Sequence, residues 1–197
     1  LQTGYGFAVI EGIPVDGLDE TQCRRLAWGL FSCIGRIVDQ KVGGSRVYDV
    51  QDKGVELEHG VRRSITNLNQ EFHTDAGWLD MPPEVIGLFC RRPAEEGGLN
   101  QLMSLRAAHD RLAEIDTAAL QRLYQPFLWD RQAEHGPDES KVKAQPVFYE
   151  SEGRLNVRYY DDYIRNGQEI AGEELDPEGV EALAALRASA AQRRYTE

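Results

Sequence analysis

The chain has 197 residues, 41% of them hydrophobic and 28% charged, which is typical of one globular domain with a sizeable core. Its formal net charge of -11 argues against a nucleic-acid partner, because such a partner favours a basic face. No apolar run approaches the roughly 20 residues of a membrane-spanning helix, and the start of the chain lacks the basic segment of a signal peptide. We therefore expect a cytoplasmic protein with no membrane partner.

The first forty residues predict one strand and one helix. Residues 6–13 form an apolar run that indicates a buried strand. Asp19 is a suitable N-cap for a helix that reaches about Ile37, because apolar residues recur every four positions along one face. The cysteines fit no zinc-binding spacing and lie in apolar surroundings, so we expect three reduced thiols in the core: Cys23, Cys33 and Cys90.

The next segment combines two expected strands with a long polar loop. Residues 46–50 and residues 65–75 are the expected strands. The polar stretch between them, residues 51–64, contains two glycines and is expected to be mobile. Loops of this length within a domain are often active-site lids, and we expect this one to act as a lid.

Two strands and two helices are expected in the middle of the chain. Residues 84–91 form a strongly apolar run that predicts a central strand, and a shorter strand follows at 100–103. Ser104 then caps a helix of about ten residues, and a second short helix is expected over 117–125.

The C-terminal part predicts a hairpin and a helix. Residues 146–149 and 155–159 are expected to pair as a hairpin that turns at 152–153, a Glu-Gly dipeptide. The last element is a helix over 177–194, for which Asp176 is a good N-cap.

The tripeptide His73-Thr74-Asp75 is the strongest indication of chemistry in the chain. A histidine and a carboxylate two residues apart point the same way from an extended backbone. They are two of the three ligands of the 2-His-1-carboxylate facial triad, which holds non-haem Fe(II). The spacing alone is weak, because it arises often by chance.

The other three histidines lack this setting. His109 is followed by Asp110, but neighbouring residues on a helix do not face the same point, so we expect His109 to lie on the surface or to pack against another helix. His59 and His135 lie in polar loops and are expected to be solvated.

The residues around the tripeptide are more specific than its spacing. Residues 72–76, 82–90 and 92–100 together resemble the taurine dioxygenase family of Fe(II)/2-oxoglutarate-dependent oxygenases, which includes gamma-butyrobetaine hydroxylase-like members. Other segments also look like this family, namely residues 4–15, 35–40, 146–148 and 158–164. The resemblance covers nearly the whole chain.

The resemblance implies an α+β fold whose core is a double-stranded β-helix, a cupin-like jelly roll of the clavaminate synthase-like kind, with flanking helices. Residues 1–197 would form a single oxygenase domain. The family's distal histidine and an arginine that pairs with 2-oxoglutarate are expected after the last helix, and neither occurs before Glu197. We therefore expect a partial domain that carries two of the three iron ligands.

The resemblance also assigns roles to individual residues. His73 and Asp75 become the iron ligands. Asn100 takes the place of a small polar residue that contacts 2-oxoglutarate, where Ser or Thr is more usual. The alternative for Asn100 is an amide that caps a turn.

Four further polar residues are candidates for the substrate pocket. Asn67 and Asn69 alternate along the expected strand that leads to the ligands, and the alternative is that they pair with backbone at a sheet end. Arg158 and Tyr160 share one face of an expected strand and would meet a polar substrate. The alternative for this pair is surface pairing with the acids that follow it.

The resemblance implies an enzyme that uses Fe(II), with 2-oxoglutarate and O2 as cosubstrates. The expected reaction is oxidation of a small polar molecule by hydroxylation, with release of succinate and CO2. Desaturation, ring formation, the identity of the substrate and homo-oligomerisation are left open. The alternatives are a non-catalytic module on the same scaffold that binds a metal or a small molecule, and a structural protein with coincidental motifs.

Overall fold

A computed structural model describes residues 6–40, 44–56, 61–190 and 194–196 and shows a mixed α/β protein. Two compact units make up the chain. The first holds Leu1–Val50 and Pro83–Leu99, and the second holds Gln51–Pro82 and Asn100–Glu197. Among the described residues, no helix is both long enough and apolar enough to cross a membrane.

The first unit has one regular element among its described residues, helix α1 (Glu20–Ser32). The Asp19 carboxylate accepts the backbone N–H of Gln22 at 2.8 Å, and the Gln22 side chain accepts the backbone N–H of Asp19 at 2.9 Å. This reciprocal capping box satisfies two donors that the first turn would otherwise leave unpaired. The predicted cap is confirmed, and the helix ends five residues before the expected Ile37.

The strands expected in the first unit are absent from its described residues. Residues 6–13, 46–50 and 84–91 are irregular, and the side chains of Val9 and Leu88 are 53% and 67% exposed. The predictions of a buried strand at 6–13 and a central strand at 84–91 are therefore wrong for this structure. An apolar run predicts burial, but a strand also needs a neighbour that pairs its N–H and C=O groups.

Only one of the three cysteines lies in a core. Cys23, on α1, is buried as expected, whereas Cys33 and Cys90 are exposed and were wrongly predicted to be buried. Cys33 directly follows α1, and its thiol donates to the carbonyl of Gly29 at 3.3 Å. Apolar neighbours in the sequence did not place this cysteine on the buried face of the helix.

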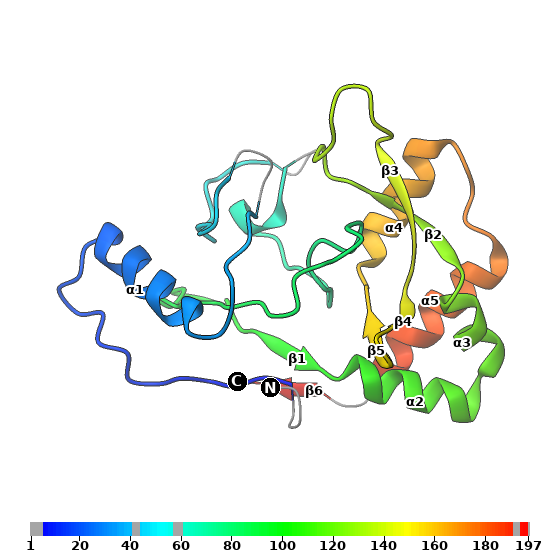
Figure 1. The fold of residues 1–197 in the computed structure, drawn as a ribbon, viewed down its shortest axis with the longest axis horizontal. Helices are drawn as coiled ribbons and strands as arrows, with labels where there is room; N and C mark the ends of the chain where they lie inside the picture. The colour runs from blue at the N-terminus through cyan, green and yellow to red at the C-terminus, as the bar shows by residue number, and fades with distance from the viewer. Residues whose placement is uncertain (1–5, 41–43, 57–60, 191–193, 197) are drawn as a thin grey trace. The chain divides into compact units, whose positions relative to one another are not determined.

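The second unit contains the other helices and strands (Figure 1). Its helices are the short 3-10 helix η1 (Arg63–Ile65), α2 (Leu105–Ile115), α3 (Thr117–Leu123), α4 (Asp161–Ala171) and α5 (Pro177–Ala190). Its strands are β1 (Gln101–Met103), β2 (Pro126–Asp130), β3 (Val142–Pro146), β4 (Phe148–Ser151), β5 (Arg154–Val157) and β6 (Arg194–Thr196). They pair as three small antiparallel sheets, β1 with β6, β2 with β3 and β4 with β5.

Several elements of the second unit agree with the sequence. Ser104 caps α2 through the backbone N–H of Ala107, and Asp176 accepts the backbone N–H of Gly179 at the start of α5. The β4–β5 hairpin turns at Glu152 and Gly153 with φ of 52° and 71°, as a tight two-residue turn requires. These predictions and the short strand β1 are confirmed. The last helix was predicted to reach residue 194, but α5 ends at Ala190 and Arg194 belongs to β6, while residues 191–193 lie outside the described residues.

Other elements of this unit were not expected from the sequence. The segment 65–75, predicted as a strand, holds the end of η1 and then irregular chain. The strands β2 and β3 and the helix α4 were not predicted. Helix α4 packs directly on β2: a Cβ added to Gly167 would lie 2.3 Å from the carbonyl oxygen of Leu128.

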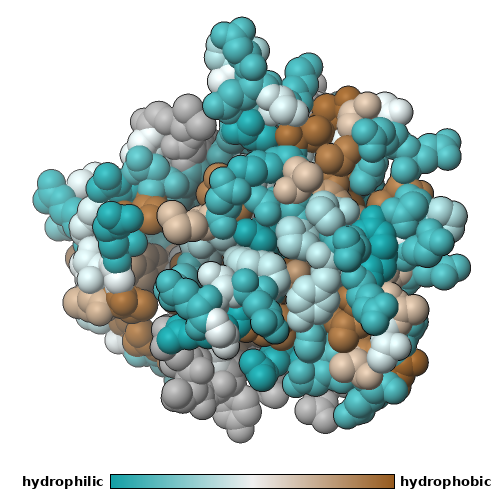
Figure 2. Space-filling model, turned by 45° about the vertical axis from the view of Figure 1, so that its right-hand side comes forward, coloured by the Kyte–Doolittle hydropathy of each residue, from teal (hydrophilic) through white to brown (hydrophobic). Residues whose placement is uncertain are grey.

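The core of the second unit lies between its helices and its small sheets. Its largest fully buried side chains come from β2, β4, the chain beside α4 and the helices; they are Trp129, Tyr160, Phe127, Phe148, Leu112 and Leu123. Trp129 also donates from its indole Nε1 to the carbonyl of Gln145, at 3.0 Å. On the face drawn in Figure 2, hydrophilic side chains predominate and hydrophobic ones form small separate patches, as the acidic composition implies.

Candidate functional site

The His73-Thr74-Asp75 tripeptide brings two donor atoms to one place. His73 Nε2 and Asp75 Oδ1 are 3.9 Å apart, and their side chains are 24% and 52% exposed. Two atoms that bind one ion at about 2.1 Å are at most about 4.2 Å apart, and adjacent ligands of a facial triad, at about 90°, are about 3.0 Å apart. The two donors would therefore share one ion in that geometry after moving closer by about 0.9 Å. Within the described ranges, no group of three or more His, Cys, Asp or Glu side chains is arranged to hold a metal.

The ring of His73 is oriented by its own backbone. Its Nδ1 lies 2.7 Å from the carbonyl oxygen of Glu71. Since a carbonyl only accepts, this contact places the proton on Nδ1 and leaves the lone pair of Nε2 on the side of Asp75. A ligating histidine commonly has this arrangement, in which the second nitrogen donates to a carbonyl.

Thr74, between the two donor residues, is bound to the segment that follows β5. Its backbone N–H donates to the carbonyl of Tyr159 at 2.6 Å, and its hydroxyl accepts the backbone N–H of Tyr159 at 3.0 Å. These two hydrogen bonds join residues that are 85 positions apart in the sequence. The tripeptide is therefore held in place although it belongs to no regular element.

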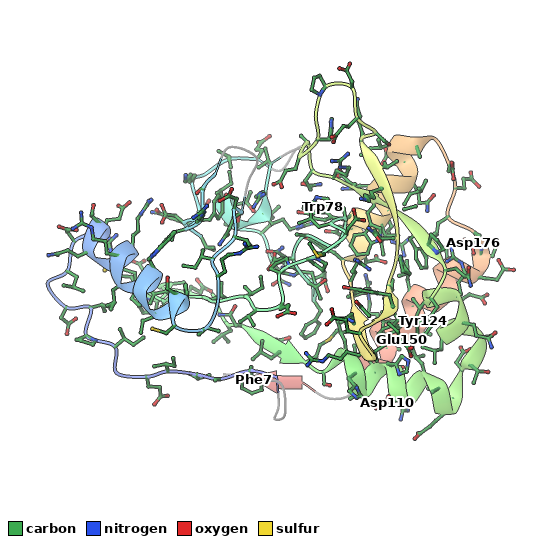
Figure 3. The ribbon with its side chains drawn as sticks, in the orientation of Figure 1. Phe7, Trp78, Asp110, Tyr124, Glu150 and Asp176 are labelled. Atoms are coloured by element: carbon green, nitrogen blue, oxygen red, sulfur yellow. The ribbon has the colours of Figure 1, made fainter. Side chains whose placement is uncertain are left out.

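The turn after Asp75 is anchored in the core. Ala76 has a φ of 52°, in the left-handed region, and Trp78 is 5% exposed with its ring 5.7 Å from that of Tyr163 (Figure 3). A Cβ added to Gly77 would lie 2.4 Å from the ring of Trp129, so this turn passes close against the indole. Glycine is required at that position by close approach.

Arg158 supports the same turn. Its guanidinium donates to the carbonyls of Leu79 and Asp80 at 3.3 and 3.0 Å, and it lies 3.7 Å from the centre of the Tyr149 ring. Arg158 is only 3% exposed, and burial lowers its pKa. Within the part of the chain that the structure describes, Arg158 forms no ion pair with Asp161 or Asp162, the acids that follow it, and its guanidinium binds backbone carbonyls instead.

Tyr160 lies against the imidazole of His73. The two ring centres are 4.9 Å apart, and the ring of Tyr163 follows at 4.2 Å from Tyr160. Burial, and secondarily the charge of Asp162, raises the pKa of Tyr160, so its phenol remains protonated at neutral pH. Tyr160 thus packs on the candidate ligand as a neutral ring.

The three asparagines occupy other positions. Asn67, Asn69 and Asn100 are exposed, and Asn100 directly precedes β1. Asn67 lines an open hollow of about 310 Å³ whose other lining residues are Asp52, Gly54, Val55, Glu56 and Leu68. In the described part of the chain, no hydrogen bond joins any of these three side chains to His73 or Asp75.

The remaining histidines lie elsewhere. His109 Nε2 is 3.0 Å from the hydroxyl of Tyr124, its Nδ1 is 3.0 Å from Asp110, and its ring packs edge-on against Phe148. Burial and the nearby Glu150 raise the pKa of Tyr124 (Figure 3). The contact with Tyr124, the C-cap of α3, agrees with the expected packing against another helix, but the contact with Asp110 contradicts the expectation that these two side chains face different points.

His135, which was expected to be solvated, contributes no donor atom to the site. His135 is partly buried in its loop, where its Nδ1 lies 2.9 Å from the carbonyl of Gly136. His59 lies outside the described residues.

Sequence reasoning missed Thr74 and Tyr159. No local pattern marks either residue as a support of the site, because their hydrogen bonds join distant segments. In the segment 158–164, Arg158 and Tyr160 were predicted to contact substrate and not to support the tripeptide. What the structure adds is that residues 158–160 support the tripeptide and its turn through backbone and ring contacts.

Two comparisons with known proteins find similarity over most of the chain. The family described as "Taurine catabolism dioxygenase TauD, TfdA family" matches residues 1–197. FR-33289 synthase of Streptomyces rubellomurinus (strain ATCC 31215) is 26% identical over 162 residues, which are 81% of this chain and 46% of the synthase. The chain therefore spans about half the length of this curated relative.

Proposed function

The chain belongs to the taurine catabolism dioxygenase TauD, TfdA family, and on this premise we propose that it forms the metal-binding part of an Fe(II)/2-oxoglutarate-dependent dioxygenase. Enzymes of the family typically use Fe(II), 2-oxoglutarate and O2. The reaction that we propose is oxidation, by hydroxylation, of a small polar molecule, with release of succinate and CO2. The fold that we propose for the whole protein is the family's jelly roll.

One observation carries this proposal: the two donor atoms of His73 and Asp75 lie 3.9 Å apart and are accessible. Imidazole and carboxylate are the ligand types of the facial-triad Fe(II) sites. His73 would contribute the Nε2 lone pair that its bond to Glu71 leaves free, and Asp75 would contribute one oxygen. Bound iron with its cosubstrates supplies the oxidising power, and the protein supplies position and exclusion of water.

The other residues take their proposed roles from their surroundings. Asn100 is proposed to contact 2-oxoglutarate, and Asn67 and Asn69 are proposed to contact substrate, because all three are exposed polar groups. Arg158 and Tyr160 were expected to contact substrate, but they are 3% and 2% exposed. Their contacts with the turn and with His73 fit a positioning role better.

The segment 51–64 is proposed to be a lid beside the substrate position. Backbone bonds from Gln51 to Ser64 and from Lys53 to Ile65 hold its two ends together. Residues 52 and 54–56 face the hollow that Asn67 lines.

The decisive experiment measures succinate formed by the full-length protein with Fe(II) and 2-oxoglutarate. We expect Asp75→Ala and His73→Ala to lower it by more than about 100-fold, because loss of a ligand exceeds the usual effect of losing a ligand's supporting group. Asp138→Ala and His135→Ala are matched controls, since Asp138 is exposed in a loop and His135 bonds only its neighbour. Unchanged turnover in Asp75→Ala would show that the ligand assignment is wrong.

A non-catalytic module that binds a metal or a small molecule is the second candidate. It is favoured by one observation, that only two donor side chains meet at the site within the described residues. Metal binding that depends on His73 and Asp75, with no succinate formed by the full-length protein, would support this second reading.

A further inference from the structure

We propose that Thr74 is a positioning residue whose hydroxyl sets the separation of the two metal-binding atoms on either side of it. The inference rests on the proposed function, because it takes His73 and Asp75 as ligands. It concerns a residue that is not itself a ligand. Its basis is the pair of hydrogen bonds between Thr74 and Tyr159.

The two hydrogen bonds act at different points of Thr74. The backbone N–H donates to Tyr159 and fixes the peptide that joins residues 73 and 74. The hydroxyl oxygen accepts the N–H of Tyr159 and so takes the part that a backbone carbonyl plays in a strand pair. With only the first bond, the residue would be free to turn about that contact; with both, it has one orientation.

The ligand spacing has no room to widen. The observed separation of 3.9 Å is already about 0.9 Å longer than the roughly 3.0 Å between adjacent facial ligands of one ion. His73 and Asp75 directly precede and follow Thr74. A rotation of Thr74 that widened their separation would take the two donor atoms further from the spacing that one ion needs.

Tyr159 is a rigid partner for Thr74. It is 3% exposed, and its phenol bonds to Arg187 of α5. Arg187 also bonds the buried carboxylate of Asp161 at 3.0 Å, at the start of α4. The backbone that receives Thr74 is thus fixed from two helices, and the position of the tripeptide follows from them.

The test compares Thr74→Val with Thr74→Ser in the full-length protein, with Co(II) as the probe and calorimetric titration as the measurement. Valine keeps the branched shape and removes the hydroxyl, whereas serine keeps the hydroxyl. We expect Thr74→Val to weaken Co(II) binding by about tenfold or more, as loss of a ligand's support does, and Thr74→Ser to stay within about threefold of the unmodified protein.

Thr66→Val is the matched control for general loss of stability. The Thr66 hydroxyl also bonds backbone on both sides, to the carbonyl of Arg63 at 2.9 Å and from the N–H of Leu68 at 3.3 Å. It contacts neither candidate ligand. We expect Thr66→Val to lower the melting temperature while Co(II) affinity is unchanged.

Each outcome bears on the proposal. If Thr74→Val melts earlier but binds Co(II) as tightly as the unmodified protein, the hydroxyl is only structural and the proposal is overturned. If His73→Ala and Asp75→Ala also bind Co(II) as tightly as the unmodified protein, the assignment of these two residues as ligands is wrong. Should Thr74→Val not fold, Thr74→Ala gives the same comparison with a smaller side chain.

Discussion

Asp176 shows at the residue scale how one carboxylate serves two purposes. It accepts the N–H of Gly179 at the start of α5, and it pairs with the guanidinium of Arg122 at 2.6 Å. The bond to Arg122, and secondarily the bond to Gly179, lowers the pKa of Asp176 from 3.8 to about 2. The folded state therefore binds this proton less readily than the unfolded state does.

This difference predicts a pH effect on stability. Because the folded pKa is the lower one, the carboxylate contributes its full stabilisation above about pH 4 and loses it as the pH falls toward 2. Asp176→Asn keeps a good N-cap without the charge. Between pH 4 and pH 2, we expect the free energy of unfolding to fall less for Asp176→Asn than for the unmodified protein. The difference should be under about 1 kcal/mol, because the Asp176 side chain is 43% exposed.

Urea denaturation at several pH values checks this prediction, with Asp138→Asn as the control in an exposed loop. Parallel pH profiles for the unmodified protein and Asp176→Asn would contradict it.

At the element scale, local signals predicted the helices better than the strands. Asp19, Ser104 and Asp176 mark real helix starts, because a cap acts within one turn of its own residue. The turn at 152–153 is equally local. The strand predicted at 84–91 was wrong because pairing depends on distant segments that no short pattern contains.

At the candidate site, too, local features could be predicted from the sequence and contacts between distant segments could not. The spacing of His73 and Asp75 could be read from the sequence, and the structure places their donor atoms 3.9 Å apart. The contacts of Thr74 and Arg158 could not be read, because their partners lie 78 to 85 residues away. Helix α4 was missed since its N-cap is Tyr160, which makes no side-chain cap bond.

The packing of α4 on β2 carries a prediction of its own. Alanine normally favours a helix over glycine by about 1 kcal/mol, but a Cβ at position 167 would lie 2.3 Å from the carbonyl oxygen of Leu128. Backbone cannot move aside as a side chain can. We expect Gly167→Ala to lower the free energy of unfolding by about 1–3 kcal/mol, measured by chemical denaturation.

Asn166→Ala is the control, because Asn166 is exposed on the same helix and gains helix propensity without a clash. A Gly167→Ala variant as stable as Asn166→Ala would refute the close contact between α4 and β2.

At the scale of the whole molecule, the two units differ in how much they bury. The large buried cluster belongs to the second unit. In the described part of the first unit, the buried apolar side chains are Cys23 and Ala27 on α1. Local stability follows such burial, so the units are expected to open with different free energies.

Hydrogen exchange measured by mass spectrometry checks this expectation. We expect slow exchange in peptides from α2, α3, α4 and β2, and exchange at least about tenfold faster in peptides from 6–18 and 84–99. Equal protection of the two units would show that burial within each unit does not govern its opening.

The two hydrogen bonds between Thr74 and Tyr159 can form only after both residues have been synthesised. The two residues are 85 positions apart, so a ribosome working at about 5–20 residues per second finishes Tyr159 roughly 4 to 17 seconds after Thr74. Closing a loop of that length costs about 4 kcal/mol of chain entropy, which must be offset by the packing of later helices. During that interval Thr74 has no partner at Tyr159. We therefore expect the proposed ligands His73 and Asp75 to reach their relative positions, and to bind the proposed metal, only once the second unit has folded.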